Sequence, residues 1–116
     1  MNFYICTLDL KDDAKALAFA HALDAWMGLL KSRDVILDWR LSRRKLNLAD
    51  TPYRDFLLEI AVRDMAQLDR AFRVSGEQDE EVAALYRSVH ALIHRADFAL
   101  YRPFPDPERV ERMGLL

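Results

Sequence analysis

The sequence predicts an α+β domain in which four antiparallel strands form one sheet with helices on a single face. Residues 53–64 alternate so regularly between apolar and polar side chains that they read as a strand with one core face. Two long helix-favouring segments, residues 14–31 and 78–95, each lie between expected strands, which gives the order β-α-β-β-α-β. Right-handed crossovers then place both helical segments on the same face of the sheet.

Length and composition are those of one small globular domain spanning residues 1–116. The formal net charge of -2 argues against general attraction to nucleic acid or anionic membranes. The single cysteine, Cys6, excludes an intramolecular disulfide and fits a reducing compartment. We find neither a leader segment nor a long uncharged apolar stretch, so we expect a cytoplasmic protein without a membrane-spanning segment.

The first strand is predicted at residues 3–10, where both faces are largely apolar, as in a central strand. Asp12 or Asp13 is a good N-cap for the helix over residues 14–31. Apolar side chains occupy most of the circumference of this helix, which is more than one sheet covers. A partner subunit could supply the remaining cover.

The second strand is predicted at residues 35–45, and residues 46–52 contain turn formers that lead into the third strand as a β-hairpin. The alternation in the second strand separates an apolar face from a strongly polar one. The apolar positions are Val35, Leu37, Trp39 and Leu41, and the polar positions are Asp38, Arg40, Ser42 and Arg44. In the third strand Phe56, Leu58, Ile60 and Val62 form the core face, opposite Asp55, Glu59 and Arg63.

The second half of the chain predicts two helices and the last strand. Asp64 and Gln67 fit a capping box that opens a short helix to residue 73, and residues 78–95 form a one-sided amphipathic helix. Residues 96–104 are the fourth strand, which prolines terminate. We expect the tail, residues 105–116, to dock on the domain or on a partner subunit, and the first and third strands to be the central pair.

This order of elements is the ferredoxin-like arrangement, and it resembles the dimeric α+β barrel superfamily, which includes stress-responsive A/B-barrel proteins and antibiotic-biosynthesis monooxygenases. The whole chain also resembles an uncharacterised bacterial family through SRRKLNLAD (residues 42–50), YRDFLLEI (53–60) and LYRPFPDPER (100–109). The resemblance implies a homodimer that packs sheet to sheet around a shared barrel, which in those families often holds a small ligand. Those monooxygenases commonly use histidine and asparagine around the substrate. The strands expected here contain no histidine, so no catalytic residue is transferred.

The polar face of the sheet supplies the candidate ligand-binding residues, which are Asp38, Arg40, Glu59 and Tyr101. One interpretation is an ion-pair network that fixes the register of a dimer. A second is a pocket in which Arg40 binds an anionic or carbonyl group. A third is a plain solvated face.

The sequence is therefore compatible with three functions. The first is a binding or accessory module for a small aromatic or carboxylated metabolite. The second is a cofactor-independent oxygenase or isomerase, in which Glu59 or Asp38 removes a proton, Arg40 stabilises the oxyanion and Tyr101 donates a hydrogen bond. The third is a structural dimer without a ligand.

Other chemistry-bearing residues give weaker patterns. His90 and His94 have helical i, i+4 spacing, but a third metal ligand is not evident, so we predict a solvated helix face and no metal. Cys6 is expected to be a buried, inert thiol. The basic run at residues 40–45 is divided between two strand faces, and three glycines are too few for a nucleotide-binding loop. We therefore expect no nucleic-acid partner and no cofactor.

Overall fold

The computed structural model describes residues 1–46, 48–50 and 53–105. Four strands form one antiparallel sheet in the order β2-β3-β1-β4, so the first and third strands are central, as predicted. The expected docking of the tail falls on residues 106–116, outside the described part of the chain. The strands are β1 (Asn2–Leu10), β2 (Asp38–Arg43), β3 (Phe56–Val62) and β4 (Ile93–Tyr101).

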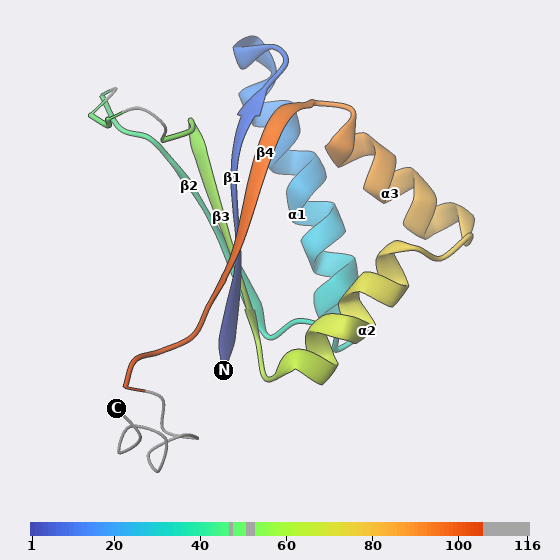
Figure 1. The fold of residues 1–116 in the computed structure, drawn as a ribbon. Coiled ribbons are helices and arrows are strands. Elements are labelled where there is room, and N and C mark those ends of the chain that lie inside the picture. The colour runs from blue at the N-terminus through green and yellow to red at the C-terminus, as the bar shows by residue number, and fades with distance from the viewer. Residues whose placement is uncertain (47, 51–52, 106–116) are drawn as a thin grey trace.

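The helices of the described residues all lie on one face of the sheet, which confirms the predicted ferredoxin-like α+β fold (Figure 1). None of these helices covers the other face, which is called the open face below. The helix α1 lies along the sheet, while α2 and α3 form a wedge farther from it (Figure 1). None of the helices in the described ranges is both long and apolar enough to cross a membrane. The helical elements are η1 (Asp13–Lys15), α1 (Ala16–Ser32), α2 (Met65–Ser75) and α3 (Glu80–His90).

The pairing of β1 with β3 sets which side chains face the helices. Cys6 lies opposite Leu58 and Leu8 lies opposite Phe56, and all four side chains are buried. Successive strand residues point to opposite faces, so the intervening residues of both strands lie on the open face. The core face predicted for the third strand is therefore correct.

The second strand is shorter than predicted, because residues 35–37 belong to the connection between α1 and β2. Val35 and Ile36 are buried there as part of the core. Asp34 precedes them with a φ of 56°, a left-handed conformation that reverses the chain after α1. Val35 and Ile36 are therefore apolar because they are buried in the core, and not because they belong to a strand.

The helix predicted over residues 78–95 ends at His90, and the last strand already begins at Ile93. Ile93 pairs with Leu10, and the backbone N–H of Lys11 donates to the carbonyl of Leu92 at 3.0 Å. This pairing with β1 overrides the continuing helical pattern. His94 consequently lies in a strand, so the expectation that the strands contain no histidine is wrong, as is a shared helix face for His90 and His94.

Gln67 connects the start of α2 to the turn after α1. Its N–H donates to the Asp64 carboxylate at 2.8 Å, which confirms the predicted cap, while its side-chain Oε1 accepts from the N–H of Arg63 at 2.6 Å. Its Nε2 donates to the carbonyl of Asp34 at 3.2 Å. The side chain is 0% exposed, so its amide hydrogen bonds are shielded from water.

We predict that Gln67→Met lowers the free energy of unfolding by about 1–3 kcal/mol, because two backbone groups lose a buried partner. Urea denaturation followed by circular dichroism measures this change. The matched control is Gln78→Met at an exposed position, where we expect a change within about 0.5 kcal/mol. Equal effects of the two substitutions would contradict the role given to Gln67.

Candidate functional site

Three of the four predicted ligand-binding residues lie together on the open face. Arg40 pairs directly with Glu59 across β2 and β3, and its Nε and Nη2 donate to the same Glu59 Oε1 at 3.2 and 2.8 Å. The Arg40 side chain is 72% exposed, so solvent screens this ion pair. Asp38 is two residues away on β2.

Asp38 already has partners of its own. The backbone N–H of Trp39 donates to its Oδ1 at 2.9 Å, and Lys31 Nζ lies 3.4 Å from the same oxygen. The hydrogen bond from Trp39, followed by Lys31, lowers the pKa of this carboxyl below its usual value. A carboxylate stabilised in this way is a weak general base.

A hollow of about 250 Å³ lies at this position, lined by Phe3, Asp38, Trp39, Arg40, Glu59 and Ala61. Tyr101 lies opposite Phe3 on β4, three strand spacings from Asp38 along the same row of the sheet. Three spacings correspond to about 14 Å. Within one chain, Tyr101 is therefore separated from the other three candidates.

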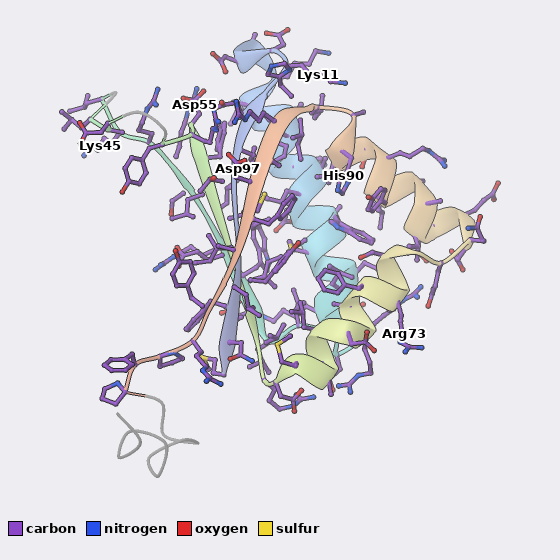
Figure 2. The ribbon with its side chains drawn as sticks, viewed as in Figure 1. Lys11, Lys45, Asp55, Arg73, His90 and Asp97 are labelled. Carbon is purple, nitrogen blue, oxygen red and sulfur yellow. The ribbon has the colours of Figure 1, made fainter. Side chains whose placement is uncertain are left out.

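Arg54, which the sequence analysis did not single out, joins two strands at the end of the open face. Its Nη1 lies 3.3 Å from Asp9 on β1, and its Nε lies 3.2 Å from Asp97 on β4. Asp9 also accepts from the N–H of Asp55 at 2.9 Å. Figure 2 shows Asp55 and Asp97 at the same end of the sheet. Arg54 has an 18% exposed side chain, so this group of charges is more shielded than the Arg40 pair.

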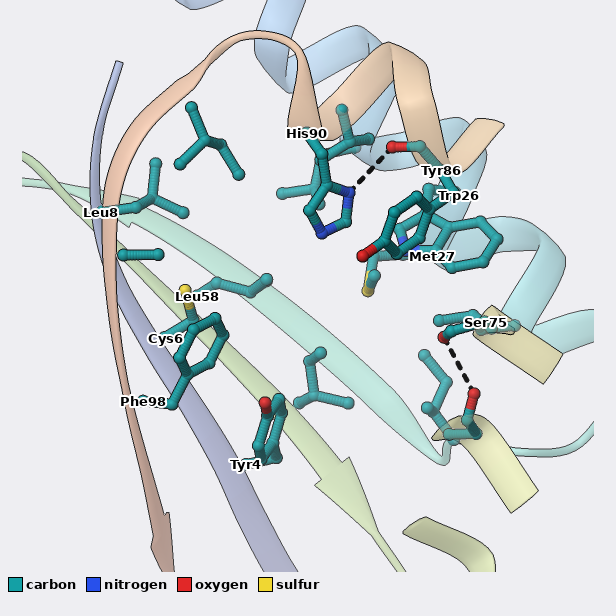
Figure 3. A pocket seen from close by; sticks show the side chains of 18 of the residues that line it. Tyr4, Cys6, Leu8, Trp26, Met27, Leu58, Ser75, Tyr86, His90 and Phe98 are labelled. Carbon is teal, nitrogen blue, oxygen red and sulfur yellow. Dashed lines mark hydrogen bonds between the residues drawn. The ribbon is translucent and has the colours of Figure 1, made fainter. Parts of the chain in front are cut away.

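The larger pocket lies on the opposite side, between the sheet and the three α-helices (Figure 3). Its volume is about 290 Å³, and side chains from β1, β3, β4, α1, α2 and α3 line it. The strands contribute Tyr4, Cys6, Leu8, Leu58, Ile60, Ile93, Ala96 and Phe98, while the helices contribute residues that include Trp26, Met27, Phe72, Ser75, Tyr86 and His90. Neither Lys, Arg, Asp nor Glu occurs among the lining residues.

Aromatic rings frame this pocket in two groups. On the sheet side, Tyr4 stacks on Phe98 with ring centroids 5.7 Å apart and meets Phe72 edge to face at 5.4 Å. On the helix side, Tyr86 meets Trp26 edge to face at 5.9 Å. Phe72, Tyr86 and Phe98 are 50%, 38% and 60% exposed, so an apolar rim opens to solvent.

The polar groups of the pocket are few. Ser75 Oγ donates to the carbonyl of Ala71 at 2.9 Å, and His90 Nδ1 lies 2.8 Å from the carbonyl of Tyr86. Burial, followed by the charge of Asp97, raises the pKa of the Cys6 thiol to about 11, so the thiol is protonated at neutral pH. Burial also raises the pKa of the Tyr4 hydroxyl. The predicted inert character of Cys6 agrees with this environment.

The sequence analysis missed this pocket because its lining residues follow the same periodicities as core residues. A pattern of apolar positions does not reveal whether the space between two elements is filled. One signal was available in Phe72 and Phe98, which are large aromatic residues outside the core positions named from the sequence. In the described ranges, groups of three metal-ligating side chains are also absent.

The family model that matches this chain spans residues 1–116. The chain belongs to the family of unknown function DUF6614. This agrees with the resemblance to an uncharacterised family. No curated protein matches the chain significantly.

Solved structures share the fold of this DUF6614 member at low sequence identity. A dimeric ferredoxin-like protein of unknown function from Jannaschia sp. CCS1 superimposes with a TM-score of 0.65 at 9% identity, covering 88% of this chain and 98% of that one. A dabb family protein from Mesorhizobium loti gives 0.62 at 15% identity, with 89% and 96% covered. A candidate antibiotic biosynthesis monooxygenase from Nitrosomonas europaea gives 0.63 at 14% identity, with 90% and 99% covered. At these identities the likeness establishes the fold alone.

We predict that Arg54→Met lowers the free energy of unfolding by about 1–2 kcal/mol, because Asp9 and Asp97 lose their shared cation in a partly shielded site. Chemical denaturation measures the effect. Arg73→Met is the matched control, since Arg73 forms an exposed i, i+4 pair with Asp69 and should change stability by less than about 0.5 kcal/mol. A larger loss in the Arg73 variant than in the Arg54 variant would refute the assignment.

Proposed function

We propose that this protein is a homodimeric binding protein for a small, planar and largely apolar metabolite, which it holds between the sheet and the helices. The observation that carries the proposal is the pocket of about 290 Å³ with its aromatic frame. Its volume lies just below the usual range for ligand sites, about 300–1,000 Å³, so the ligand must be small. One or two fused rings suit such a volume.

The chemistry of the lining supports this ligand class. Phe98 and Tyr86 present ring faces and edges from opposite walls, and planar rings gain stacking and edge-to-face contacts with such groups. The lining residues carry no formal charge, so a charged ligand would lose its hydration without gaining an ion pair. We therefore favour a neutral aromatic compound over the carboxylated one considered from the sequence.

The open face supports self-association. Phe3, Ile5 and Ala99 lie on it as neighbouring positions of β1 and β4, so an uncovered sheet face carries apolar side chains beside the Arg40–Glu59 pair. The Jannaschia protein of the same fold is described as dimeric. A second copy packed on this face would cover these residues.

The open-face candidates Asp38, Arg40, Glu59 and Tyr101 stay a prediction for a second site. It is favoured by the 250 Å³ hollow beside Arg40, which a second subunit packed on this face would enclose. The oxygenase or isomerase alternative needs a general base, and Asp38 is a poor candidate because its pKa is lowered. A monomeric protein would remove this site.

We expect a panel of one- and two-ring neutral aromatic compounds, including 2-naphthol, to bind with micromolar to low-millimolar affinity in titrations followed by calorimetry. Ser75→Phe should weaken binding at least about tenfold by filling the pocket. Ser88→Phe is the matched control, because Ser88 Oγ also donates to a backbone carbonyl but lies outside the pocket. If no compound binds, or if both variants bind equally well, the proposal is wrong. Circular dichroism verifies that each variant folds.

We expect light scattering to give a mass near twice the 13.5 kDa of one chain across a range of concentrations. Ala99→Arg, which adds a charge opposite Ile5 on the open face, should shift the protein toward the monomer. Ala18→Arg on the exposed side of α1 is the control and should leave the dimer intact. A stable wild-type monomer, or dissociation by the control alone, would refute a dimer through the sheet.

A further inference from the structure

Tyr86 and His90, one turn apart on α3, form a stacked pair in the pocket wall. Their ring centroids lie 3.8 Å apart with an interplanar angle of 17°. Tyr86 in turn meets Trp26 of α1 edge to face, and this contact holds the Tyr86 ring in place. The imidazole is therefore oriented by a ring contact as well as by a hydrogen bond.

The hydrogen bond of His90 determines which of its nitrogens can accept. Nδ1 lies 2.8 Å from the carbonyl oxygen of Tyr86, and a carbonyl oxygen can only accept a hydrogen bond. Nδ1 must then carry the proton. In the neutral imidazole, Nε2 is left with its lone pair and acts as an acceptor.

Nε2 is turned toward the interior of the pocket (Figure 3). Among the residues that the structure describes, none donates a hydrogen bond to it. The other polar groups of the surrounding wall are the hydroxyls of Tyr4, Ser75 and Tyr86, the indole N–H of Trp26 and the protonated thiol of Cys6. His90 Nε2 is thus an acceptor in the pocket wall whose direction is fixed by the hydrogen bond at Nδ1 and by the ring contact with Tyr86.

We propose that this pocket selects ligands with a hydroxyl group on an aromatic or enolic carbon, and that this hydroxyl donates to His90 Nε2. The inference rests on the proposed function and adds to it the polar group that the ligand must carry. An ionised carboxylate has only acceptors to offer and would face the Nε2 lone pair without a cation nearby. An ammonium group could donate, but it would lose its hydration in an uncharged pocket. A phenol or enol meets both conditions and presents a planar framework to the rings.

The test compares 2-naphthol with its methyl ether, 2-methoxynaphthalene, which has the same ring system but cannot donate. Wild-type protein should bind 2-naphthol about tenfold more tightly, as expected for one hydrogen bond that the ether cannot make. His90→Phe keeps a ring against Tyr86 and removes Nε2, so it should lose this preference while still binding the ether. His94→Phe is the control, because His94 is exposed on β4 and does not line the pocket, and it should keep the preference.

The outcomes separate this inference from the proposed function. Equal binding of the two compounds by wild-type protein, or an unchanged preference in His90→Phe, overturns the role of His90 while the pocket stands. Binding of neither compound overturns both. If His90→Phe does not fold, nitrogen NMR of the labelled imidazole in wild-type protein decides. The Nε2 signal should move on addition of 2-naphthol but not of the ether, and a proton on Nε2 in the free protein would refute the proposal.

Discussion

The register between β1 and β3 is the constraint on which the rest of the structure depends. Pairing Cys6 with Leu58 and Leu8 with Phe56 gathers the apolar positions of the two central strands on one face. A shift by one residue would turn Glu59 toward the helices and Leu58 toward the open face. The core under α1, the charged pairs of the open face and the helix-side pocket all follow from this one alignment.

The two faces of the sheet consequently differ in chemistry. On the open face, charged side chains pair across strands, as Arg40 does with Glu59 and Arg54 with Asp9 and Asp97. On the helix side, the pocket is lined without formal charges. Burial of a charge is costly unless it is paired, so a wall of this composition disfavours charged groups from solvent. The open face is therefore suited to polar and charged contacts, and the helix-side pocket to uncharged, apolar ones.

The sequence predicts the order of strands and their faces well, because alternation has a physical cause in the pleat of a strand. It is less informative where two patterns compete, as at Leu92 and Ile93, which continue the helical stripe of α3 but pair with the end of β1. The helix-side pocket was not predicted, since apolar periodicity does not reveal whether the space between the sheet and the helices is filled. Arg54 was missed for a related reason, because its partners are distant in sequence and lie on two different strands.

The pocket is assembled from residues of six separate elements, which extend from Tyr4 near the amino terminus to Phe98 in the last strand. A molecule that fills it would contact residues from distant parts of the sequence, which come together only in the folded chain. The unfolded chain would have no such site. Ligand binding and folding then become linked equilibria. Above the dissociation constant, each tenfold rise in ligand concentration adds about 1.4 kcal/mol to the free energy of unfolding. The melting temperature of this protein would in that case act as a gauge of ligand concentration, and the proportion of folded chain in a cell would vary with the supply of the metabolite.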